Sequence, residues 1–571
     1  MFPKEKVNNL DSVHKTSATL VDALETSARR VPDRGIAIFD RRGQNAERRS
    51  YAELSAAALR AAWLLAAAGI APGDRVLISL PTSWNLLEIY FGAIYRGAFP
   101  VLLAPSGALG GAAAHSKKIV ALLEMLGPKR FICDESTRQQ LLEFDADADT
   151  NAMEAASLSL TYAELIALAP VPGMGRRNAS PGDLAFMQLT SGSTGRARAV
   201  KIKHSSVVHN ALAMGHATGV TESDRVVCWL PLNHDMGLVG CLMFSLVHGL
   251  DLWLLRPDTF LARPKLWLQT LSKHGGTLSP APNFAYQLCV ERVKSEELDG
   301  VDLAQWRCAL TGAEMIRPET CAAFNATFAA SQFAPQHWRP CYGLAEGTLA
   351  VTIDTKCEGI RSLPVSTGLG GDDVNEVVCA GAPVIDTAIR IVAPGGSSES
   401  LSDGKIGEIW AKGPGVFAGY YNDEPATSEA LHEGWLRTGD LGFLKEGELY
   451  ITGRTKDLLI INGHNFMPHE FEWIAEGVCG GGGSLRSGAF SVSKGSTGEQ
   501  AVLIVEAPGD IGDLGALEHD VRSRVGRTLG LPLFDLVFLK RGQIPKTSSG
   551  KVQRAELRRR YLDGKLERLN P

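Results

Sequence analysis

The regular alternation of short apolar runs with helical patterns over the first 300 residues is the feature that most constrains the fold of this chain. Strand-like runs at 225–232, 251–257 and 277–282, for example, are separated by two segments of helical periodicity. This alternation is typical of mostly parallel sheets covered by helices. Such sheets bind ligands beyond the carboxyl ends of their strands. The sequence therefore predicts an α/β fold in which the polar loops after the strands hold the functional site.

The length of the chain predicts more than one domain, because 571 residues exceed what a single hydrophobic core usually supports. We expect a large N-terminal domain of several subdomains over residues 1–452, with mostly parallel sheets flanked by helices and a β-rich subdomain. A boundary is predicted at 453–457, and a small α+β C-terminal domain at 458–571. The glycine-rich, weakly periodic stretch 356–376 is interpreted as a surface insertion or long loop, within about 352–377.

The composition excludes several classes of protein. Hydrophobic residues make up 45% of the chain and charged residues 21%, which is ordinary for a globular protein. The formal net charge of −5 gives no general reason to expect nucleic acid or an anionic membrane as a partner. Ten cysteines occur singly, without a CxxC pair, which argues against a zinc site and a disulfide framework. The chain has neither an apolar signal region nor a membrane-spanning stretch, so a cytoplasmic protein is expected.

A loop rich in hydroxyls and glycine follows the apolar run 184–190. Its residues are Thr190, Ser191, Gly192, Ser193, Thr194 and Gly195. Glycines let successive backbone N–H groups point inward, and the hydroxyls add donors, which together suit phosphate. A plain turn is the alternative, and the cations that follow at 196–203 favour phosphate. The Walker A pattern is missing, so a P-loop NTPase is not predicted.

Two further loops carry residues suited to chemistry. In the stretch 229–240, His234 could orient a carboxylate or bind a phosphate oxygen, while Asp235 is interpreted as a helix cap. In the stretch 339–351, Tyr342 offers a flat face for a purine and Glu346 a carboxylate for a hard cation. Taken alone, the second stretch could be no more than the start of a helix.

Eight segments occur in the order of the core motifs of the adenylate-forming acyl and aryl ligases, which the chain resembles from about residue 20 to 560. They read LTSGSTGRARAVKIKH, WLPLNHDMG, TGAE, YGLAEGTLAV, GEIWAKGPGVFAGYYN, GWLRTGDLGF, GRTKDLLIINGHNFMPHEFE and PKTSSGKVQR. This superfamily contains acyl-CoA synthetases, nonribosomal adenylation domains and luciferases. Three stretches, WLPLNHDMGLVG, PAPNFAYQLC and KDLLIINGHNFMPHEFE, together with the insertion, are most similar to fatty acyl-AMP ligases.

The resemblance implies a ligase of fatty acid or lipid metabolism, in lipid, siderophore, polyketide or lipopeptide biosynthesis. Such an enzyme uses ATP and Mg²⁺ to convert a fatty or related carboxylic acid into its adenylate, releasing pyrophosphate. It then passes the acyl group to the phosphopantetheine thiol of an acyl carrier protein. Two alternatives stay open: an acyl- or aryl-CoA synthetase, and a catalytically silent nucleotide-binding or carrier-docking module.

The resemblance also implies a role for individual residues. The loop from Thr190 to Gly195 would wrap the β- and γ-phosphates, and the residues implied around the adenine are Gly312, Ala313, Glu314, Tyr342, Gly343 and Leu344. The remaining roles are Glu346 as the Mg²⁺ ligand, Thr348 as an α-phosphate contact, Asp440 on the ribose with Arg454 assisting, His234 and Lys551 as catalytic residues, and Lys456 as the hinge of a mobile C-terminal domain.

One position departs from the pattern of the superfamily. Arg198 stands where a lysine is expected after the phosphate loop. The charge is kept, but the guanidinium is planar and forked, and it suits phosphate at least as well as an ammonium group does. Near the expected acid site, the apolar stretches 236–249 and 282–289 could line a tunnel for an alkyl chain or could belong to the core.

Overall fold

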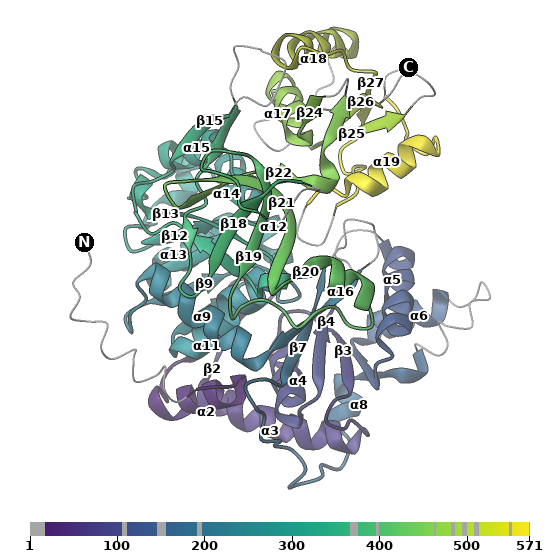
Figure 1. Ribbon diagram of the computed structural model, residues 1–571. Coiled ribbons are helices and arrows are strands. Elements are labelled where there is room, and N and C mark those ends of the chain that lie inside the picture. The colour runs from purple at the N-terminus through teal and green to yellow at the C-terminus, as the bar shows by residue number, and fades with distance from the viewer. Residues whose placement is uncertain are drawn as a thin grey trace.

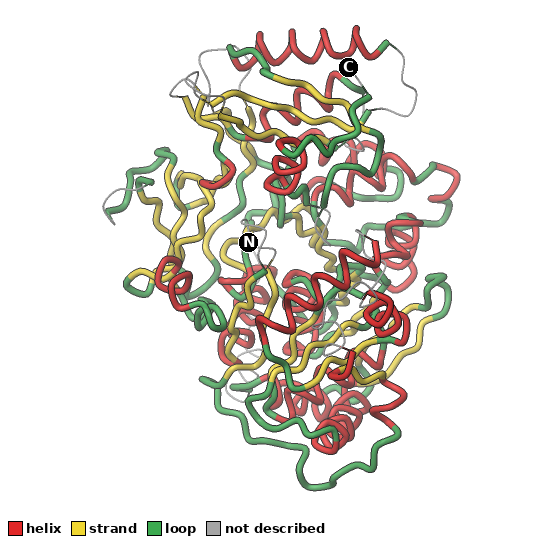
Figure 2. The backbone as a smooth tube through the Cα atoms, turned by 90° about the vertical axis from the view of Figure 1, so that its right-hand side faces the viewer, coloured by secondary structure: helices red, strands yellow, loops and turns green. Residues whose placement is uncertain are grey.

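The computed structural model describes residues 17–105, 111–144, 156–190, 197–365, 375–394, 399–461, 464–480, 486–493, 499–507, 513–546 and 551–569. A large body of sheets and helices carries a smaller unit, built from the C-terminal part of the chain, at one end (Figure 1). The view turned by 90° shows the same arrangement, with the strands of the smaller unit below a long helix (Figure 2). The predicted α/β class is therefore confirmed.

The larger sheet of the body has nine strands in the order β17-β14-β13-β12-β11-β9-β10-β1-β2. In that order the strands are Ala382–Pro383, Ala350–Ile353, Trp338–Gly343, Cys308–Thr311, Leu278–Ala281, Arg225–Cys228, Asp251–Leu254, Gly35–Phe39 and Ala46–Ser50. The neighbours from β13 to β1 pair in parallel, while β2, β14 and β17 pair antiparallel at the two edges. The parallel core agrees with the βα alternation of the sequence.

A second sheet of the body has six strands in the order β6-β5-β3-β4-β7-β8. In that order the strands are Ser159–Thr161, Arg130–Cys133, Arg75–Ser79, Phe99–Leu102, Leu184–Thr190 and Arg198–Lys203. All neighbours pair in parallel except β7 and β8, which run antiparallel. The register of that pair places Thr190 opposite Arg198.

Helices cover these sheets and bury their apolar faces against the strands. The helices before β9 are α2 (Leu20–Arg30), α3 (Tyr51–Ala67), α4 (Trp84–Arg96), α5 (Gly111–Leu126), α6 (Glu135–Phe144), α8 (Tyr162–Ile166) and α9 (His204–Thr218). Those after β9 are α10 (Asp235–Gly237), the π-helix η3 (Leu238–Met243), α11 (Phe244–His248), α12 (Pro257–Ala262), α13 (Lys265–His274), α14 (Asn283–Arg292), η4 (Ser295–Leu298), α15 (Pro318–Phe328), η5 (Pro335–His337) and η6 (Ala345–Gly347). None of the described helices combines the length and the apolar character needed to cross a membrane.

The predicted β-rich part of the body is a third sheet in the order β18-β19-β21-β20, with β22 paired to β21. These strands are Ala388–Val392, Gly407–Lys412, Trp435–Lys445, Leu431–His432 and Glu448–Arg454, and α16 (Glu424–Ala430) lies beside them. The antiparallel pairing of β21 with β22 sets Asp440 opposite Arg454. The fold of these two strands thus brings the side chains of Asp440 and Arg454 next to each other.

The glycine-rich stretch predicted as a loop contains regular structure. Strands β15 (Ser362–Val365) and β16 (Asn375–Val378) form an antiparallel ribbon, and residues 366–374 lie outside the described part. Valines of the ribbon pack in one cluster with Phe443 and Tyr450 of the third sheet. Arg361 anchors the ribbon because its guanidinium pairs with Glu448 at 2.6 Å and with Asp354 at 2.5 Å. The weak sequence periodicity missed this ribbon, since tertiary contacts rather than local pattern hold it in place.

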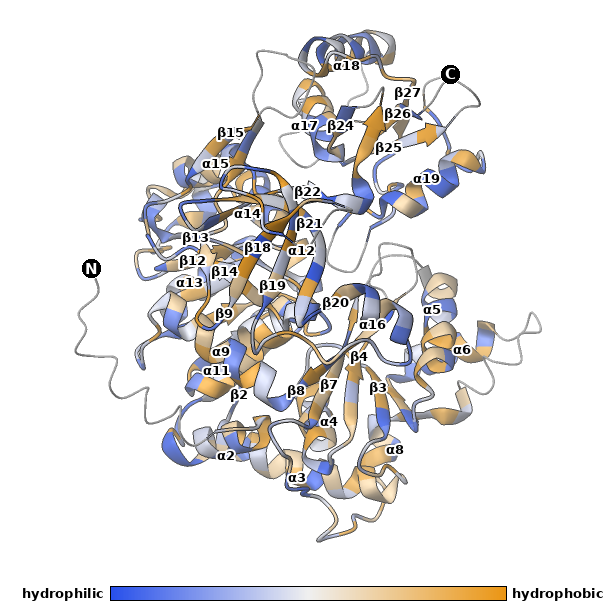
Figure 3. Ribbon diagram, in the orientation of Figure 1, coloured by the Kyte–Doolittle hydropathy of each residue, from blue (hydrophilic) through white to orange (hydrophobic). Residues whose placement is uncertain are grey.

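The C-terminal part of the chain has hydrophobic clusters of its own. Its elements are η7 (Thr455–Asp457), β23 (Leu459–Ile461), β24 (His464–Phe466), α17 (Pro468–Val478), β25 (Ser487–Ser493), β26 (Glu499–Glu506), α18 (Leu514–Leu529), β27 (Asp535–Leu539) and α19 (Arg554–Leu562). Strands β25 and β26 carry mostly hydrophobic residues and α18 mostly hydrophilic ones (Figure 3). The α+β pattern read from the sequence agrees with most of these elements, while β24 and α19 were not anticipated.

Candidate active site

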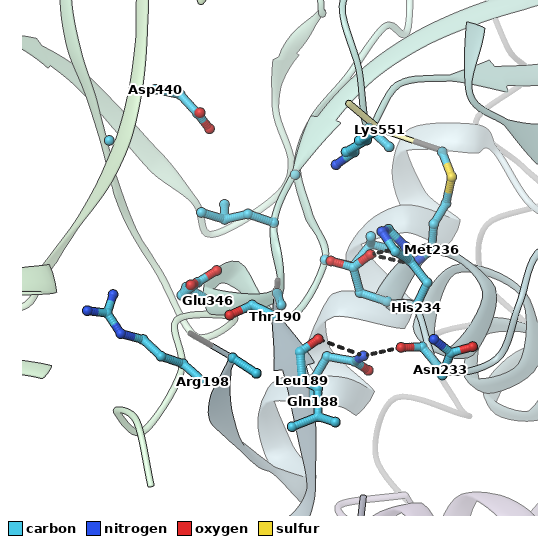
Figure 4. A pocket seen from close by; sticks show the side chains of 18 of the residues that line it. Gln188, Leu189, Thr190, Arg198, Asn233, His234, Met236, Glu346, Asp440 and Lys551 are labelled. Carbon is cyan, nitrogen blue, oxygen red and sulfur yellow. Dashed lines mark hydrogen bonds and ion pairs between the residues drawn. The ribbon is translucent and has the colours of Figure 1, made fainter. Parts of the chain in front are cut away.

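A cavity of about 910 Å³ brings residues of the large body and of the C-terminal part together. The predicted site residues that line it are Thr190, Arg198, His234, Ala313, Tyr342, Gly343, Leu344, Glu346, Asp440, Arg454, Lys456 and Lys551. The labelled side chains of Asp440, Glu346 and Lys551 approach the same space from different parts of the fold (Figure 4). Segments more than 300 residues apart in the sequence therefore meet at one place.

The predicted phosphate loop connects two strands of the six-stranded sheet. Thr190 ends β7 and Arg198 begins β8, and both residues line the cavity. Ser191, Gly192, Ser193, Thr194 and Gly195 lie outside the described residues. The described residues on either side of this segment thus lie on the wall of the cavity.

The side chain of Arg198 is held by two partners. Its Nε lies 3.4 Å from Oδ2 of Asp423, and its guanidinium lies 5.1 Å from the centre of the Tyr420 ring. About a quarter of this side chain is exposed, at 28%. Asp423 and the Tyr420 ring therefore hold the cation at the cavity wall, where its exposed part can meet an anionic ligand.

A hydrogen-bonded chain joins the residues implied around the nucleoside. The hydroxyl of Tyr342 donates to Oδ2 of Asp440 at 2.6 Å, and Nε of Arg454 donates to Oδ1 of the same carboxylate at 2.9 Å. Burial and the Asp440 charge raise the pKa of Tyr342 well above its ordinary value, so the phenol stays neutral. Asp440 also raises the pKa of Arg454. One buried carboxylate thereby fixes an aromatic ring and a cation.

The turn that carries Tyr342 and Glu346 depends on glycine. A Cβ added to Gly343 would lie 1.8 Å from the carbonyl oxygen of Leu349, so no other residue fits at this crossing of two backbones. Glu346 lies in the short helix η6, and its Oε1 accepts a hydrogen bond of 2.7 Å from the hydroxyl of Tyr420. Burial raises the pKa of Glu346, although the Tyr420 hydrogen bond opposes this shift.

Three predicted nucleotide contacts differ in placement from what the resemblance implied. The buried hydroxyl of Thr348 donates to the carbonyl oxygen of Gly415 at 2.6 Å and does not line the cavity, so an α-phosphate contact is not supported. Gly312 packs against the backbone of Cys341, where an added Cβ would lie 2.5 Å from the carbonyl oxygen. Glu314 accepts the N–H of Phe284 at 2.6 Å and lines an adjoining cavity of about 1280 Å³.

His234 and Asp235 exchange the positions that the sequence suggested. His234 has extended backbone at the cap position of α10, and Asp235 is the first helical residue. Oδ1 of Asp235 lies 2.7 Å from both the Met236 nitrogen and Nδ1 of His234. Burial of Asp235 would raise its pKa, but His234 outweighs this and the pKa is lowered. The Met236 nitrogen also lies 3.4 Å from Nδ1 of His234, so two neighbours hold this side of the ring.

Lys551 brings the C-terminal part of the chain into the cavity. Its side chain lies on the far side of the space from Glu346, close to His234 and Met236 (Figure 4). Burial and then the nearby Arg454 lower the pKa of Lys551, and the charge of Asp235 opposes the shift. Lys456, in η7, also lines the cavity with an exposed side chain. Lys551 thus belongs to a group of cations of the small unit, with Lys546 and Arg560, that line the same cavity as the carboxylates of the large body.

Few residues of the two predicted tunnel segments line the apolar end of the cavity. Met236 and Gly240 line it, whereas most of the π-helix η3 is buried as core. Side chains from elsewhere complete the apolar wall, namely Met214, Pro280, Leu310, Leu349 and Ile353. In the other segment Tyr286 is fully buried among aromatic rings, and Phe284 lines the adjoining cavity.

Sequence reasoning missed two residues that organise the site. Gln188 donates from Nε2 to the carbonyl oxygen of Asn233 at 2.7 Å, which ties β7 to the loop of His234. Tyr420 contacts both Arg198 and Glu346. The tyrosine stands inside the GVFAGYYN segment that carried the resemblance, but no local pattern shows that its hydroxyl reaches a residue 74 positions away.

Comparison with known proteins agrees with this geometry. Residues 24–421 match the family described as AMP-binding enzyme. A putative acyl-CoA synthetase of Caulobacter vibrioides is 31% identical over 96% of both chains. The medium-chain-fatty-acid–[acyl-carrier-protein] ligase JamA of Moorena producens is 32% identical over 86% of both chains.

A solved structure points the same way. It comes from studies of fatty acyl-adenylate ligases from E. coli and L. pneumophila, and is 32% identical with a TM-score of 0.86. The match covers 96% of this chain and 98% of that chain. The resemblance read from the ordered motifs is therefore confirmed. The chain belongs to the AMP-binding enzyme family, as its motifs, its fold and its similarity to known members over most of its length show.

Proposed function

We propose that this protein activates a fatty acid with ATP, forming the acyl adenylate and pyrophosphate, and then transfers the acyl group to the phosphopantetheine thiol of an acyl carrier protein. The observation that carries the proposal is a single cavity in which Lys551 faces a wall containing Glu346, Asp440 and Arg198. That combination supplies positive charge on two sides of a space large enough for a nucleotide and part of an acid.

The adenosine part of ATP fits the wall built by Tyr342, Asp440 and Arg454. The ring of Tyr342 offers a flat face for the base, and its hydroxyl is already occupied by Asp440. The carboxylate of Asp440 has acceptor capacity left for ribose hydroxyls. The triphosphate then extends toward Thr190 and Arg198, at the two ends of the hydroxyl-rich loop.

The side chains at the cavity suit Mg²⁺ carried in by the nucleotide. Mg²⁺ in nucleotide sites is typically held by one or two carboxylates together with phosphate oxygens and water. Glu346 offers a carboxylate of this kind, and the described residues contain no group of three or more His, Cys, Asp or Glu side chains able to hold a metal on their own. When bound, the ion neutralises phosphate charge and so makes pyrophosphate a better leaving group.

The chain's own residues lower the barrier to an encounter between two anions. Lys551 would stabilise the charge that builds between the incoming carboxylate oxygen and the α-phosphate. Asp235 holds the ring of His234 in place, so that an Nε2–H can donate to the reacting carboxylate, which only accepts. The bond between the α-phosphorus and the bridging oxygen breaks as the acyl–oxygen–phosphorus bond forms, and pyrophosphate leaves toward Arg198.

The acid substrate fits the apolar end of the cavity. Met214, Met236 and Leu349 line it, beyond the position of His234. An alkyl chain placed there would put its carboxylate near Lys551. A fatty or other largely apolar acid therefore suits the site better than a charged one.

We further propose that residues 453–457 are a hinge between an N-terminal domain, 1–452, and a mobile C-terminal domain, 458–571. The residues before and after the short helix η7 belong to separate hydrophobic clusters. After adenylation, rotation about Lys456 would withdraw Lys551 and admit the thiol. The ribbon β15–β16 lies in the predicted insertion and favours the carrier protein over CoA as acceptor.

Two measurements test the proposed function. ATP–pyrophosphate exchange is expected with Mg·ATP and a panel of fatty acids, and absence of exchange with every acid would refute adenylation. Thioester formation is then compared between free CoA and a phosphopantetheinylated carrier protein. Transfer to CoA alone would replace the carrier-protein proposal with the CoA-ligase alternative.

A further inference from the structure

The segment 415–421 lies between the turn of Glu346 and the strand of Arg198, and it is tied to both. On one side the N–H of Phe417 donates to the carbonyl oxygen of Glu346 at 2.8 Å. On the other side the N–H of Tyr421 donates to the carbonyl oxygen of Ala199 at 2.8 Å. The segment therefore fixes the spacing between these two parts of the cavity wall.

The hydroxyl of Thr348 strengthens the first of these attachments, since it donates to the carbonyl oxygen of Gly415 at 2.6 Å. Lys201 strengthens the second, because its N–H donates to Gly419 and its carbonyl oxygen accepts from Ala418. Five hydrogen bonds thus hold the segment 415–421 in place. Within this segment, the side chain of Tyr420 contacts both Glu346 and Arg198.

Tyr420 presents a different surface to each charged residue. Its hydroxyl donates to Oε1 of Glu346 at 2.7 Å, and the face of its ring lies 5.1 Å from the guanidinium carbon of Arg198. The side chain is only 6% exposed, so its position is set by packing. Asp423, at 3.4 Å, is the other partner of Arg198.

We propose that Tyr420 is a positioning residue for Mg·ATP, with its hydroxyl setting the carboxylate of Glu346 for the divalent cation and its ring setting Arg198 for the phosphates. This inference rests on the proposed function, since it concerns the same nucleotide. It assigns two separable tasks to two parts of one side chain.

The physical basis of the first task is the occupancy of one carboxylate oxygen. With Oε1 engaged by the phenol, rotation of the Glu346 side chain is restricted, and the residue lines the cavity. A ligand held in this way loses less conformational freedom when it binds a cation, and partners that orient metal ligands are generally worth a large factor in metal affinity.

The physical basis of the second task is the stacking of a planar cation. A guanidinium that lies over an aromatic ring keeps its N–H groups at its edge, where they can pair with phosphate oxygens. A flexible lysine would not be seated by the ring in the same way. This accounts for an arginine at a position where the superfamily pattern has lysine, because Tyr420 and Asp423 hold it.

Two substitutions separate the tasks. Tyr420→Phe removes the hydroxyl and keeps the ring, while Tyr420→Leu removes both. The readouts are Mn²⁺ binding, followed by electron paramagnetic resonance in the presence of the non-hydrolysable analogue α,β-methylene-ATP, and the affinity for that analogue at saturating Mn²⁺. Tyr421→Phe is the matched control, because its ring packs 5.5 Å from the guanidinium of Arg75 and does not line the cavity.

Tyr420→Phe is expected to weaken Mn²⁺ binding about tenfold, as for a lost hydrogen bond to a charged group, with analogue affinity at saturating metal unchanged. Tyr420→Leu is expected to weaken both, and Tyr421→Phe neither. Wild-type Mn²⁺ affinity in Tyr420→Phe would overturn the role of the hydroxyl. Equal analogue affinity in the Phe and Leu variants would overturn the role of the ring.

Both readouts are independent of the acid, which separates this inference from the proposed function. A wild-type protein that binds Mn²⁺ and the analogue but exchanges pyrophosphate with no acid would refute fatty acid activation while leaving the Tyr420 result valid. Thermal unfolding of each variant shows whether the fold is kept. If Tyr420→Leu does not fold, Tyr420→Phe, which conserves the ring, still decides the role of the hydroxyl.

Discussion

The two regions that line the cavity are organised in different ways. In the large body, Asp440 is engaged by Tyr342 and Arg454, and Glu346 by Tyr420, so the wall is assembled by its own hydrogen bonds. Lys551, in contrast, is carried by a unit with separate hydrophobic clusters. Under the proposed function, nucleotide binding therefore depends on one region and the position of Lys551 on the other, and substitutions should be able to separate the two.

Lys551→Ala should have the largest effect on rate and almost none on stability. Loss of one well-placed electrostatic contact in a transition state costs on the order of 10²–10³ in rate. ATP–pyrophosphate exchange measures the rate, and thermal unfolding should shift by no more than about 1 °C. Lys565→Ala, an exposed lysine of the same unit that pairs with Asp563, is the control and should behave as wild type. An unimpaired Lys551→Ala would remove the lysine from the reaction.

Asp440→Ala should lower both the stability of the protein and its affinity for ATP, because the Asp440 carboxylate belongs to the preassembled wall. The substitution leaves the hydroxyl of Tyr342 without its acceptor and Arg454 without its partner, at a cost of about 1–3 kcal/mol in the free energy of unfolding. We also expect roughly tenfold weaker ATP binding through lost ribose contacts. Denaturant unfolding and calorimetric titration with ATP measure the two effects. Asp299→Ala, an exposed position, is the control, and a variant with weakened binding but full stability would contradict a preassembled wall.

Lys456→Pro should divide the two half-reactions. Proline fixes φ and removes an N–H, so rotation about this position is restricted. Adenylate formation is expected to stay within about twofold of wild type, and acyl transfer to a carrier protein to fall about tenfold, as for other hinge changes that slow a conformational step. Lys456→Ala removes the same charge without restricting the backbone and should transfer normally. Equal loss of both half-reactions would exclude a pure hinge role.

Arg317→Ala should have the smallest effect, since it weakens a contact between the regions and Arg317 lines the adjoining cavity rather than the one that contains Glu346. Arg317 pairs with Glu476 of α17 at 2.6 Å and lies 4.9 Å from the Trp473 ring. We expect adenylation to slow by about two- to fivefold, in keeping with a partly exposed ion pair. A double-mutant cycle with Glu476→Gln measures the coupling, and additive effects would show that the pair does not hold the two regions together.

Much of the fold could be predicted from local patterns. The run at 184–190 corresponds to β7 (Leu184–Thr190), and the apolar stretches of the C-terminal part correspond to β25, β26 and β27. These segments are buried on both faces or periodic over several residues, so the pattern alone identifies them. The ribbon β15–β16 could not be found in this way, because its strands are four residues long and depend on Arg361 and its partners.

The sequence predicted which residues form the candidate site, but not how their side chains are oriented. Ordered motifs identified Tyr342, Glu346, Asp440 and Lys551, and the structure brings all four to one cavity. The direction of a hydroxyl is decided by neighbours far away in the sequence, which is why Thr348 faces Gly415 instead of a phosphate. For the same reason the link between Tyr420 and Glu346 was visible only in three dimensions.

Gly343 has a consequence that reaches beyond its own turn. Since its backbone lies against that of Leu349 with no room for a Cβ, the stretch from Tyr342 to Glu346 cannot be lengthened or relaxed by exchanging side chains. The turn therefore keeps a fixed spacing between the ring of Tyr342 and the carboxylate of Glu346. A ligand whose ring and charged group are spaced differently can contact Tyr342 or Glu346 but not both. The backbone of this turn therefore selects nucleotides of one length.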